Sequence, residues 1–270
     1  SSSSSSSSSA TMAVKFYNQL KEDSKIILEH FKDVQAPMQS SEKEYFLGRM
    51  LAPIFARLGL KHQLVGGMRR VKQGQPSTHH DIDVLVTLSD ANAKVERRPL
   101  FKPQDMLDLI IHTLKAKKYI IRELRGGIGV LSGGSGNKQE EKKHVSSLLL
   151  CRNETGKSRR VDIFVCPPEH WPFALLGWSG SVEMEKSWKH FTKHTYEGRH
   201  GDTDEHGRVR KKENQCRWYL SNSRLSYVEK GQNKQVLDQH VIHDILTLKS
   251  ERDILRELGL PWLETWQRCA

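Results

Sequence analysis

Three aspartates are the residues in this sequence whose type and spacing most clearly suggest chemistry. Asp81 and Asp83 alternate with apolar residues in the segment 80–87, and Asp162 interrupts a second apolar segment at 160–166. This alternation predicts two buried strands, and side chains two residues apart on a strand project from the same face. A buried carboxylate needs a partner such as a cation. A third carboxylate on a neighbouring strand would complete a cluster of oxygen ligands. Such a cluster suits Mg²⁺.

Two Mg²⁺ ions held roughly 3.5–4 Å apart by shared carboxylates are the standard device for in-line phosphoryl transfer. We therefore interpret the three aspartates as the centre of a nucleotidyl-transfer site. An isolated Asp-x-Asp is more often a strand end or a loose calcium site, so this interpretation depends on the residues around the pair.

A segment rich in glycine and arginine lies upstream of the aspartate pair. Gly66 and Gly67 would let backbone amides approach an anion, and Arg69 and Arg70 would neutralise it. Because this segment immediately precedes the Asp81 strand, a triphosphate and its cations would share one site. A strand-to-helix turn with exposed arginines explains the same string about as well.

The composition favours a polyanionic partner. Lysine and arginine number 43 against 32 acidic residues, a net charge of +11 over 270 residues, which suits nucleic acid. The alternative is a basic protein surface with no nucleic-acid partner.

The four cysteines are widely spread, so neither a zinc ribbon nor a disulfide framework is indicated. No apolar run approaches the roughly 20 residues of a membrane span, and no secretory signal is present. We expect a soluble intracellular protein with no membrane partner.

The order of the predicted elements indicates an α+β fold. Apolar residues recur at helical spacing through residues 14–60 and end at Gly59, after a serine-rich tail at 1–13. Further elements are predicted as strands at 61–65, 81–87, 148–151 and 161–165 and helices at 103–117 and 182–191. Residues 125–143 predict a mobile loop and residues 192–217 a disordered insertion. A terminal helix begins at Ser250 and ends at Gly259.

Several ordered motifs together resemble the family X DNA polymerases of the nucleotidyltransferase superfamily. The resemblance rests on the segments 66–70, 80–87, 160–163, 173–181 and 258–262 and runs, with gaps, from about residue 14 to the end. The string Gly-Trp-Ser-Gly-Ser at 177–181 is similar to the branch that holds DNA polymerase mu and terminal deoxynucleotidyltransferase, since the beta and lambda branches carry Tyr-Phe-Thr-Gly-Ser there.

The resemblance implies a fold of three parts. These are a helical remnant of the fingers at 14–60, a catalytic palm with a small mixed sheet at 61–176, and a smaller α/β thumb at 177–270 that contains the insertion. No amino-terminal lyase-like domain is recognisable. The loop at 125–143 is a positional candidate for the segment that occupies the template path in this branch, and an inert hairpin connection is the alternative.

The resemblance also implies roles for individual residues. Asp81 and Asp83 would bind two Mg²⁺ ions, with Mn²⁺ as a possible substitute, and Asp162 would bind the ion that polarises the primer 3′ hydroxyl. The expected nucleotide-binding residues are Gly66, Gly67, Arg70, Lys72, His80, Gly177, Trp178, Ser179, Gly180 and Asn222. Among them Gly67 and Arg70 would hold the β and γ phosphates, and Gly177 with Trp178 would line the sugar pocket.

The sequence departs from the family pattern at three places. Val71 stands where the family has glycine, the segment 73–79 is longer than usual, and Val182 replaces an arginine that contacts the nucleotide in the branch. The first two departures lie in the segment expected to hold the triphosphate, and the third leaves one expected nucleotide contact missing. The insertion at 192–217 is also unusual for the family.

The activity implied is that of a monomeric, nuclear DNA polymerase that adds deoxynucleotides to a 3′ hydroxyl in end joining or short-gap repair. Its partners would be a primer end with a template or broken end, deoxynucleoside triphosphates and end-joining factors. Within the enzyme class, template-independent terminal transfer and RNA tailing remain alternatives, although the Gly-Trp-Ser-Gly-Ser string argues against RNA tailing. A non-enzymatic alternative is an inactive scaffold that binds DNA ends.

Overall fold

The structure is a computed structural model that describes residues 22, 25–26, 28–72, 75, 77–89, 102–125, 144–194, 216–222, 225–230, 236–240 and 248–269. The predicted tail at 1–13, nearly all of the loop predicted at 125–143 and most of the insertion predicted at 192–217 lie outside these residues.

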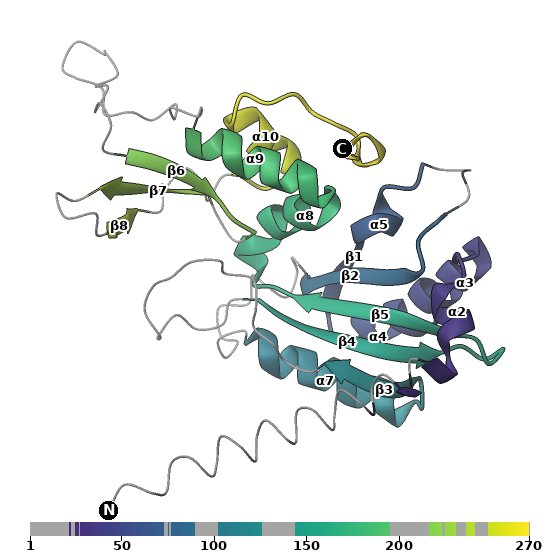
Figure 1. Cartoon of the computed structure of the whole chain (residues 1–270). Helices are drawn as coiled ribbons and strands as arrows, with labels where there is room; N and C mark the ends of the chain where they lie inside the picture. The colour runs from purple at the N-terminus through teal and green to yellow at the C-terminus, as the bar shows by residue number, and fades with distance from the viewer. Residues whose placement is uncertain are drawn as a thin grey trace, which may run out of the picture.

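A five-stranded sheet is the centre of the fold (Figure 1). Its strands are β1 (Leu60–Val65), β2 (Asp81–Leu88), β3 (Ile120–Arg125), β4 (Val145–Arg152) and β5 (Ser158–Val165). The spatial order is β1-β2-β5-β4-β3, in which β2 and β5 are parallel and the other neighbours antiparallel. The predicted α+β class with a small mixed sheet is thus confirmed. Strand β3 was not predicted.

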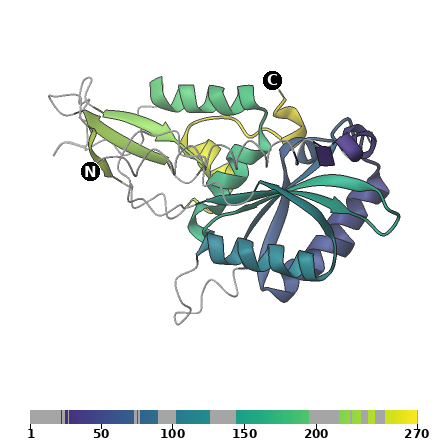
Figure 2. The ribbon, with the colours of Figure 1, turned by 60° about the horizontal axis from the view of Figure 1, so that its bottom comes forward.

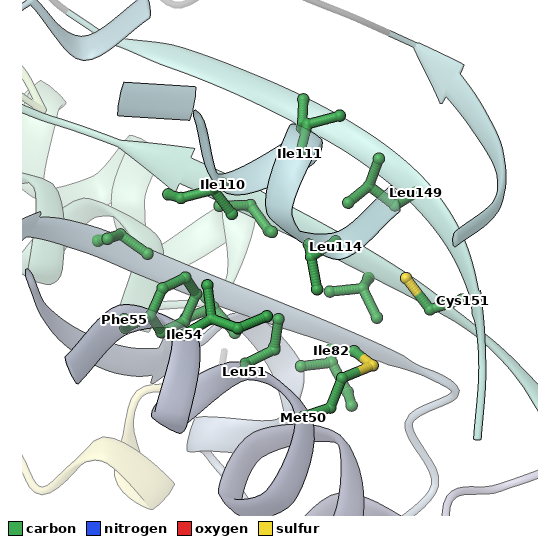
Figure 3. Close-up of a cluster of buried hydrophobic side chains, with 14 of the residues drawn as sticks. Met50, Leu51, Ile54, Phe55, Ile82, Ile110, Ile111, Leu114, Leu149 and Cys151 are labelled. Atoms are coloured by element: carbon green, nitrogen blue, oxygen red, sulfur yellow. The ribbon is translucent and has the colours of Figure 1, made fainter. Parts of the chain in front are cut away.

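Helices cover one face of this sheet with a continuous apolar core (Figure 2). They are the π-helical η1 (Tyr45–Leu51), α4 (Ala52–Arg57) and α7 (Pro103–Ala116), and the polar helix α3 (Ser40–Glu44) directly precedes η1. Figure 3 shows Leu51 and Phe55 meeting Ile82 of β2 and Leu114 of α7 in this core. The predicted helix end at Gly59 is confirmed by its left-handed backbone, with φ of 70°. Because Ile82 and Val84 of β2 point into this core, the alternate residues Asp81 and Asp83 project from the opposite face of the sheet.

The amino-terminal helices are tied to the sheet by a buried ion pair. Arg159 of β5 is 2% exposed, and its Nη2 lies 2.8 Å from Oε2 of Glu42 on α3. The same arginine donates to the carbonyl of Ala36, after α2 (Phe31–Gln35), at 2.7 Å. Burial alone would raise the pKa of Glu42, but a backbone hydrogen bond from Gln39 and the positive charge of Arg159 outweigh burial and lower it.

The opposite face of the sheet carries α8 (Trp171–Ser179), which follows the short η2 (Pro168–His170). Ala174 of α8 packs against Val65 and Leu85, whereas Phe173 and Leu176 pack into a second core. Helix α8 was not predicted, and it runs through position 177, where the boundary between palm and thumb was expected.

The second core joins α8 to the carboxy-terminal elements. These are α9 (Val182–His194), α10 (Glu251–Glu257), η4 (Thr265–Gln267) and an antiparallel sheet of β6 (Cys216–Leu220), β7 (Leu225–Lys230) and β8 (Val236–His240). Trp188, Leu225 and Ile254 meet there. The predicted cap of α10 is confirmed, because the amide of Asp253 donates to Ser250 Oγ at 3.1 Å. In the part of the chain that the structure describes, no helix has the length and apolarity to cross a membrane.

Candidate active site

The strand register brings the three aspartates together. Because β2 and β5 are parallel neighbours, Asp83 lies directly opposite Asp162, and Asp81 lies opposite Arg160. Side-chain alternation turns all three carboxylates away from the apolar core that buries Ile82. The predicted cluster of carboxylates from neighbouring strands is thus confirmed as a geometric arrangement, and its catalytic role remains a prediction.

Arg160 is the cation of this cluster. Its Nη2 donates to the carboxylate of Asp81, and its Nε lies 3.7 Å from Oδ1 of Asp162. This oxygen of Asp162 is buried and has no hydrogen-bond partner among the described residues. Sequence analysis did not assign Arg160 any role, because an arginine beside a strand aspartate carries no signal of its own. The structure makes it the counter-ion of two carboxylates.

Burial strongly perturbs the carboxylates. It raises the pKa of Asp83 to about 7, with a further rise from the charges of Asp81 and Asp162, against the opposing effect of Arg160 and Arg70. Burial likewise raises the pKa of Asp162 to about 7, where Arg160 opposes the rise and Asp81 adds to it. Near neutral pH the cluster therefore holds protons unless further positive charge is present.

The donor set fits a hard divalent cation. It consists of carboxylate oxygens, which Mg²⁺ prefers, and one of them, Oδ1 of Asp162, is buried without a hydrogen bond among the described residues. Among the described residues, no three acidic, histidine or cysteine side chains stand close enough together to hold a metal ion as they lie. In this structure the guanidinium of Arg160 pairs with Asp81 and Asp162 instead.

The glycine pair packs closely against the cluster. It opens the single-turn helix α5 (Gly66–Arg69), where a turn was predicted. Gly66 has φ of 63°, and a Cβ at this position would overlap the carboxylate of Asp83. A Cβ at Gly67 would overlap the ring of His79. A side chain at either position would therefore displace the neighbouring Asp83 or His79, and the segment lies directly beside the aspartates as predicted.

The two arginines that follow differ in their contacts. Arg70 donates to the carbonyl of Gly180 at 3.0 Å. Arg69 instead turns to the carboxy-terminal elements, where its Nη2 lies 2.6 Å from Glu251 Oε2 and its Nη1 donates to the hydroxyl of Ser179. Sequence analysis treated both arginines as anion ligands. Because Arg69 already neutralises a buried glutamate, we assign it a structural role.

Glu251 links Arg69 to a second buried arginine. Arg268 is 0% exposed, and its Nη1 lies 2.5 Å from Glu251 Oε1. Its Nε donates to the carbonyl of Leu263 at 3.0 Å. Sequence analysis missed this cluster, because two polar residues seventeen positions apart give no pattern that predicts burial. The cluster fixes the carboxy-terminal segment against α5.

A small pocket lies beside α8, between the second core and β6. It is lined by Phe173, Leu176, Gly177, Glu185, Trp188, Lys189, Leu220, Ser221 and Asn222. A Cβ at Gly177 would overlap the amide of Asn222, so these two predicted residues are in close contact. Trp178 stacks on Phe164 of β5, with ring centroids 3.9 Å apart.

The remaining predicted residues are more scattered. Ser179 is fully buried, and its hydroxyl binds Arg69 and the carbonyl of Leu175, so it does not face an open site. His80 directly precedes β2, and its Nδ1 is buried with no hydrogen-bond partner among the described residues. The ammonium of Lys72 lies 4.9 Å from the ring centroid of Trp266.

A small mixed sheet that carries such an acidic cluster on two parallel strands is consistent with a nucleotidyltransferase-like unit. No family profile matches the chain. Curated proteins similar to it are DNA nucleotidylexotransferases. That of Xenopus laevis is 28% identical over 225 residues, 77% of this chain and 36% of the relative. Those of Bos taurus and Ambystoma mexicanum are 25% and 22% identical over 234 and 274 residues, which cover 77% and 90% of this chain.

These similarities confirm the resemblance to family X polymerases that the motifs predicted. The matches cover 36%, 35% and 44% of the three relatives, so the chain spans less than half of their length.

Proposed function

We propose that this chain transfers deoxynucleotides to the 3′ hydroxyl of DNA, with Mg²⁺ held by Asp81, Asp83 and Asp162. The observation that carries the proposal is the register of β2 and β5, in which Asp83 lies opposite Asp162 with Asp81 on the same face. The similarity to DNA nucleotidylexotransferases supplies the substrate class.

Mg²⁺ at this cluster would supply charge neutralisation and Lewis acidity for in-line displacement at a phosphorus atom. The chain provides three carboxylates on adjacent strands, and Oδ1 of Asp162 accepts no hydrogen bond from the described residues. Positive charge there favours the ionised form of Asp83 and Asp162, whose pKa values lie at about 7. Arg160 would move from Asp81 towards solvent, which its half-exposed side chain permits.

The triphosphate would lie on the side of α5, next to the aspartates. Arg70, Lys72 and His80 are the basic groups of this region that we assign to its phosphates, with Gly66 and Gly67 allowing close approach. The 3′ hydroxyl of the primer would release its proton to solvent, and its oxygen would attack the α-phosphorus. A new phosphorus–oxygen bond would form while the bond from the α-phosphorus to the bridging oxygen breaks, and pyrophosphate would leave. The protein contributes by positioning the groups and stabilising charge and forms no covalent bond itself.

The sugar and base would lie towards α8 and β6. Gly177 and Asn222 line the pocket there, and Trp178 beside them is held by its stack on Phe164. The net charge of +11 supports a DNA partner bound through its phosphates. We place this activity in DNA end joining or short-gap repair in the nucleus, with end-joining factors as partners.

Primer extension tests the proposal. The chain is incubated with Mg²⁺ or Mn²⁺ and deoxynucleoside triphosphates on a single-stranded primer and on a gapped duplex. The variants are Asp162→Asn and, as a matched control, Asp108→Asn on the exposed face of α7. We expect extension by the wild type and by Asp108→Asn, a loss of at least about 100-fold in Asp162→Asn, and no extension in EDTA.

The choice of substrate separates the modes of addition. Extension confined to template-matched gapped DNA identifies a repair polymerase, and addition to the bare primer identifies a terminal transferase. Equal inactivity of the wild type and Asp162→Asn on every substrate, with DNA binding retained, would overturn the proposal in favour of a DNA-end scaffold.

A further inference from the structure

Trp266 is a large side chain left partly in solvent beside the proposed triphosphate site. It lies on η4 with 44% of its surface exposed. Its ring faces the ammonium of Lys72, which lies 4.9 Å from the ring centroid, within the range of a cation–π contact. Lys72 belongs to the segment that begins at Gly66 beside Asp83. The indole thus contacts the lysine that we assign to the triphosphate.

The turn that carries Trp266 is fixed on both sides. Glu264 and Gln267 cap it reciprocally, and the amide of Glu264 donates to Gln267 Oε1 at 2.9 Å. The next residue, Arg268, is fully buried against Glu251. A side chain between two such anchors has a defined position although it is exposed. The backbone that carries Trp266 is therefore held on both sides, and its indole offers a flat surface on which a flexible lysine can be ordered.

The carboxy-terminal elements contact the segment 66–72 at two places. Arg69 is held by Glu251 of α10, and Lys72 by Trp266. A free lysine side chain samples many rotamers, and ordering it costs conformational entropy at the moment of binding. A contact that restricts Lys72 before a ligand arrives lowers this cost.

We propose that Trp266 is a positioning residue, which holds the Lys72 ammonium ready for the phosphates of the incoming nucleotide. The inference rests on the proposed function, because it assigns Lys72 to the triphosphate. In this proposal Trp266 acts only through Lys72 and has no direct role towards the nucleotide or the metal ions. An exposed cation–π contact of this kind corresponds to a change of roughly two- to fivefold in an equilibrium constant.

The test measures KM for a deoxynucleoside triphosphate and kcat in primer extension for Trp266→Leu and Trp266→Phe. Leucine keeps apolar bulk without an aromatic face, and phenylalanine keeps a weaker face. We expect Trp266→Leu to raise KM roughly two- to fivefold with a smaller change in kcat, and Trp266→Phe to restore part of the loss. Leu109→Ala is the control, because Leu109 is also 44% exposed but lies on α7. It should change neither constant.

A double-mutant cycle separates positioning from a general structural role. If Trp266 acts through Lys72, Trp266→Leu has no further effect on KM in the background of Lys72→Gln. Independent, multiplying effects of the two changes would overturn the inference, as would an unchanged KM in Trp266→Leu alone. A wild-type chain that extends no primer contradicts the proposed function itself, an outcome visible before any Trp266 variant is measured.

Discussion

Replacement of Asp83 by asparagine should stabilise the metal-free protein at pH 8 while it removes activity. Burial and the neighbouring carboxylates raise the pKa of Asp83 from an ordinary 3.8 to about 7. The folded protein therefore holds this proton more tightly than the unfolded chain does. Asparagine has nearly the same shape and no proton to lose, so the variant avoids the cost of a buried negative charge.

The sign and size of the effect follow from the two pKa values. The unfolded chain releases the proton near pH 4 and the folded protein near pH 7, so the stability of the wild type falls as pH rises through this window. At about 1.4 kcal/mol per pH unit, the gap corresponds to at most about 4 kcal/mol above pH 7. We expect Asp83→Asn to gain about 2–4 kcal/mol at pH 8 and less than about 1 kcal/mol at pH 4.

Urea unfolding in EDTA at pH 4, 6 and 8 measures this difference. Asp108→Asn is the control, since Asp108 is exposed on α7, and it should change stability by less than about 0.5 kcal/mol at each pH. Adding Mg²⁺ at pH 8 should raise the unfolding midpoint of the wild type more than that of Asp83→Asn. A gain that does not vary with pH, or a loss of stability at pH 8, would refute the reasoning.

Two further substitutions test the packing around the site. Gly66→Ala should lower the free energy of unfolding in urea by at least about 1 kcal/mol more than Gly259→Ala does. Both glycines have a left-handed backbone, so that strain is shared, whereas only a Cβ at position 66 overlaps Asp83. Equal losses would contradict the close approach. Glu251→Gln should destabilise by about 3–5 kcal/mol in thermal unfolding, since it removes the charge that two buried arginines share. Glu183→Gln, exposed on α9, is its control, and a loss below about 1 kcal/mol would contradict the role of the cluster.

Some elements escaped sequence analysis for identifiable physical reasons. Strand β3 carries arginine and glutamate and lies at the edge of the sheet with one neighbour, so no apolar alternation marks it. Helix α8 is buried on two sides, because Ala174 faces one core and Phe173 another. A helix with apolar residues all round has no 3.6-residue stripe. Its glycine at 177 instead suggested a boundary.

The sequence by itself determined the strands that carry the aspartates, the glycine-rich segment before them and the helix ends at Gly59 and Gly259. These features depend on local periodicity and backbone freedom, which neighbouring residues encode. Only the tertiary structure decided that Asp83 meets Asp162, that Arg160 bridges two carboxylates, and that Arg69 serves Glu251. Strand order and burial bring together residues that are far apart in the chain. Such long-range pairs cannot be predicted from the hydrophobic periodicity of a local segment.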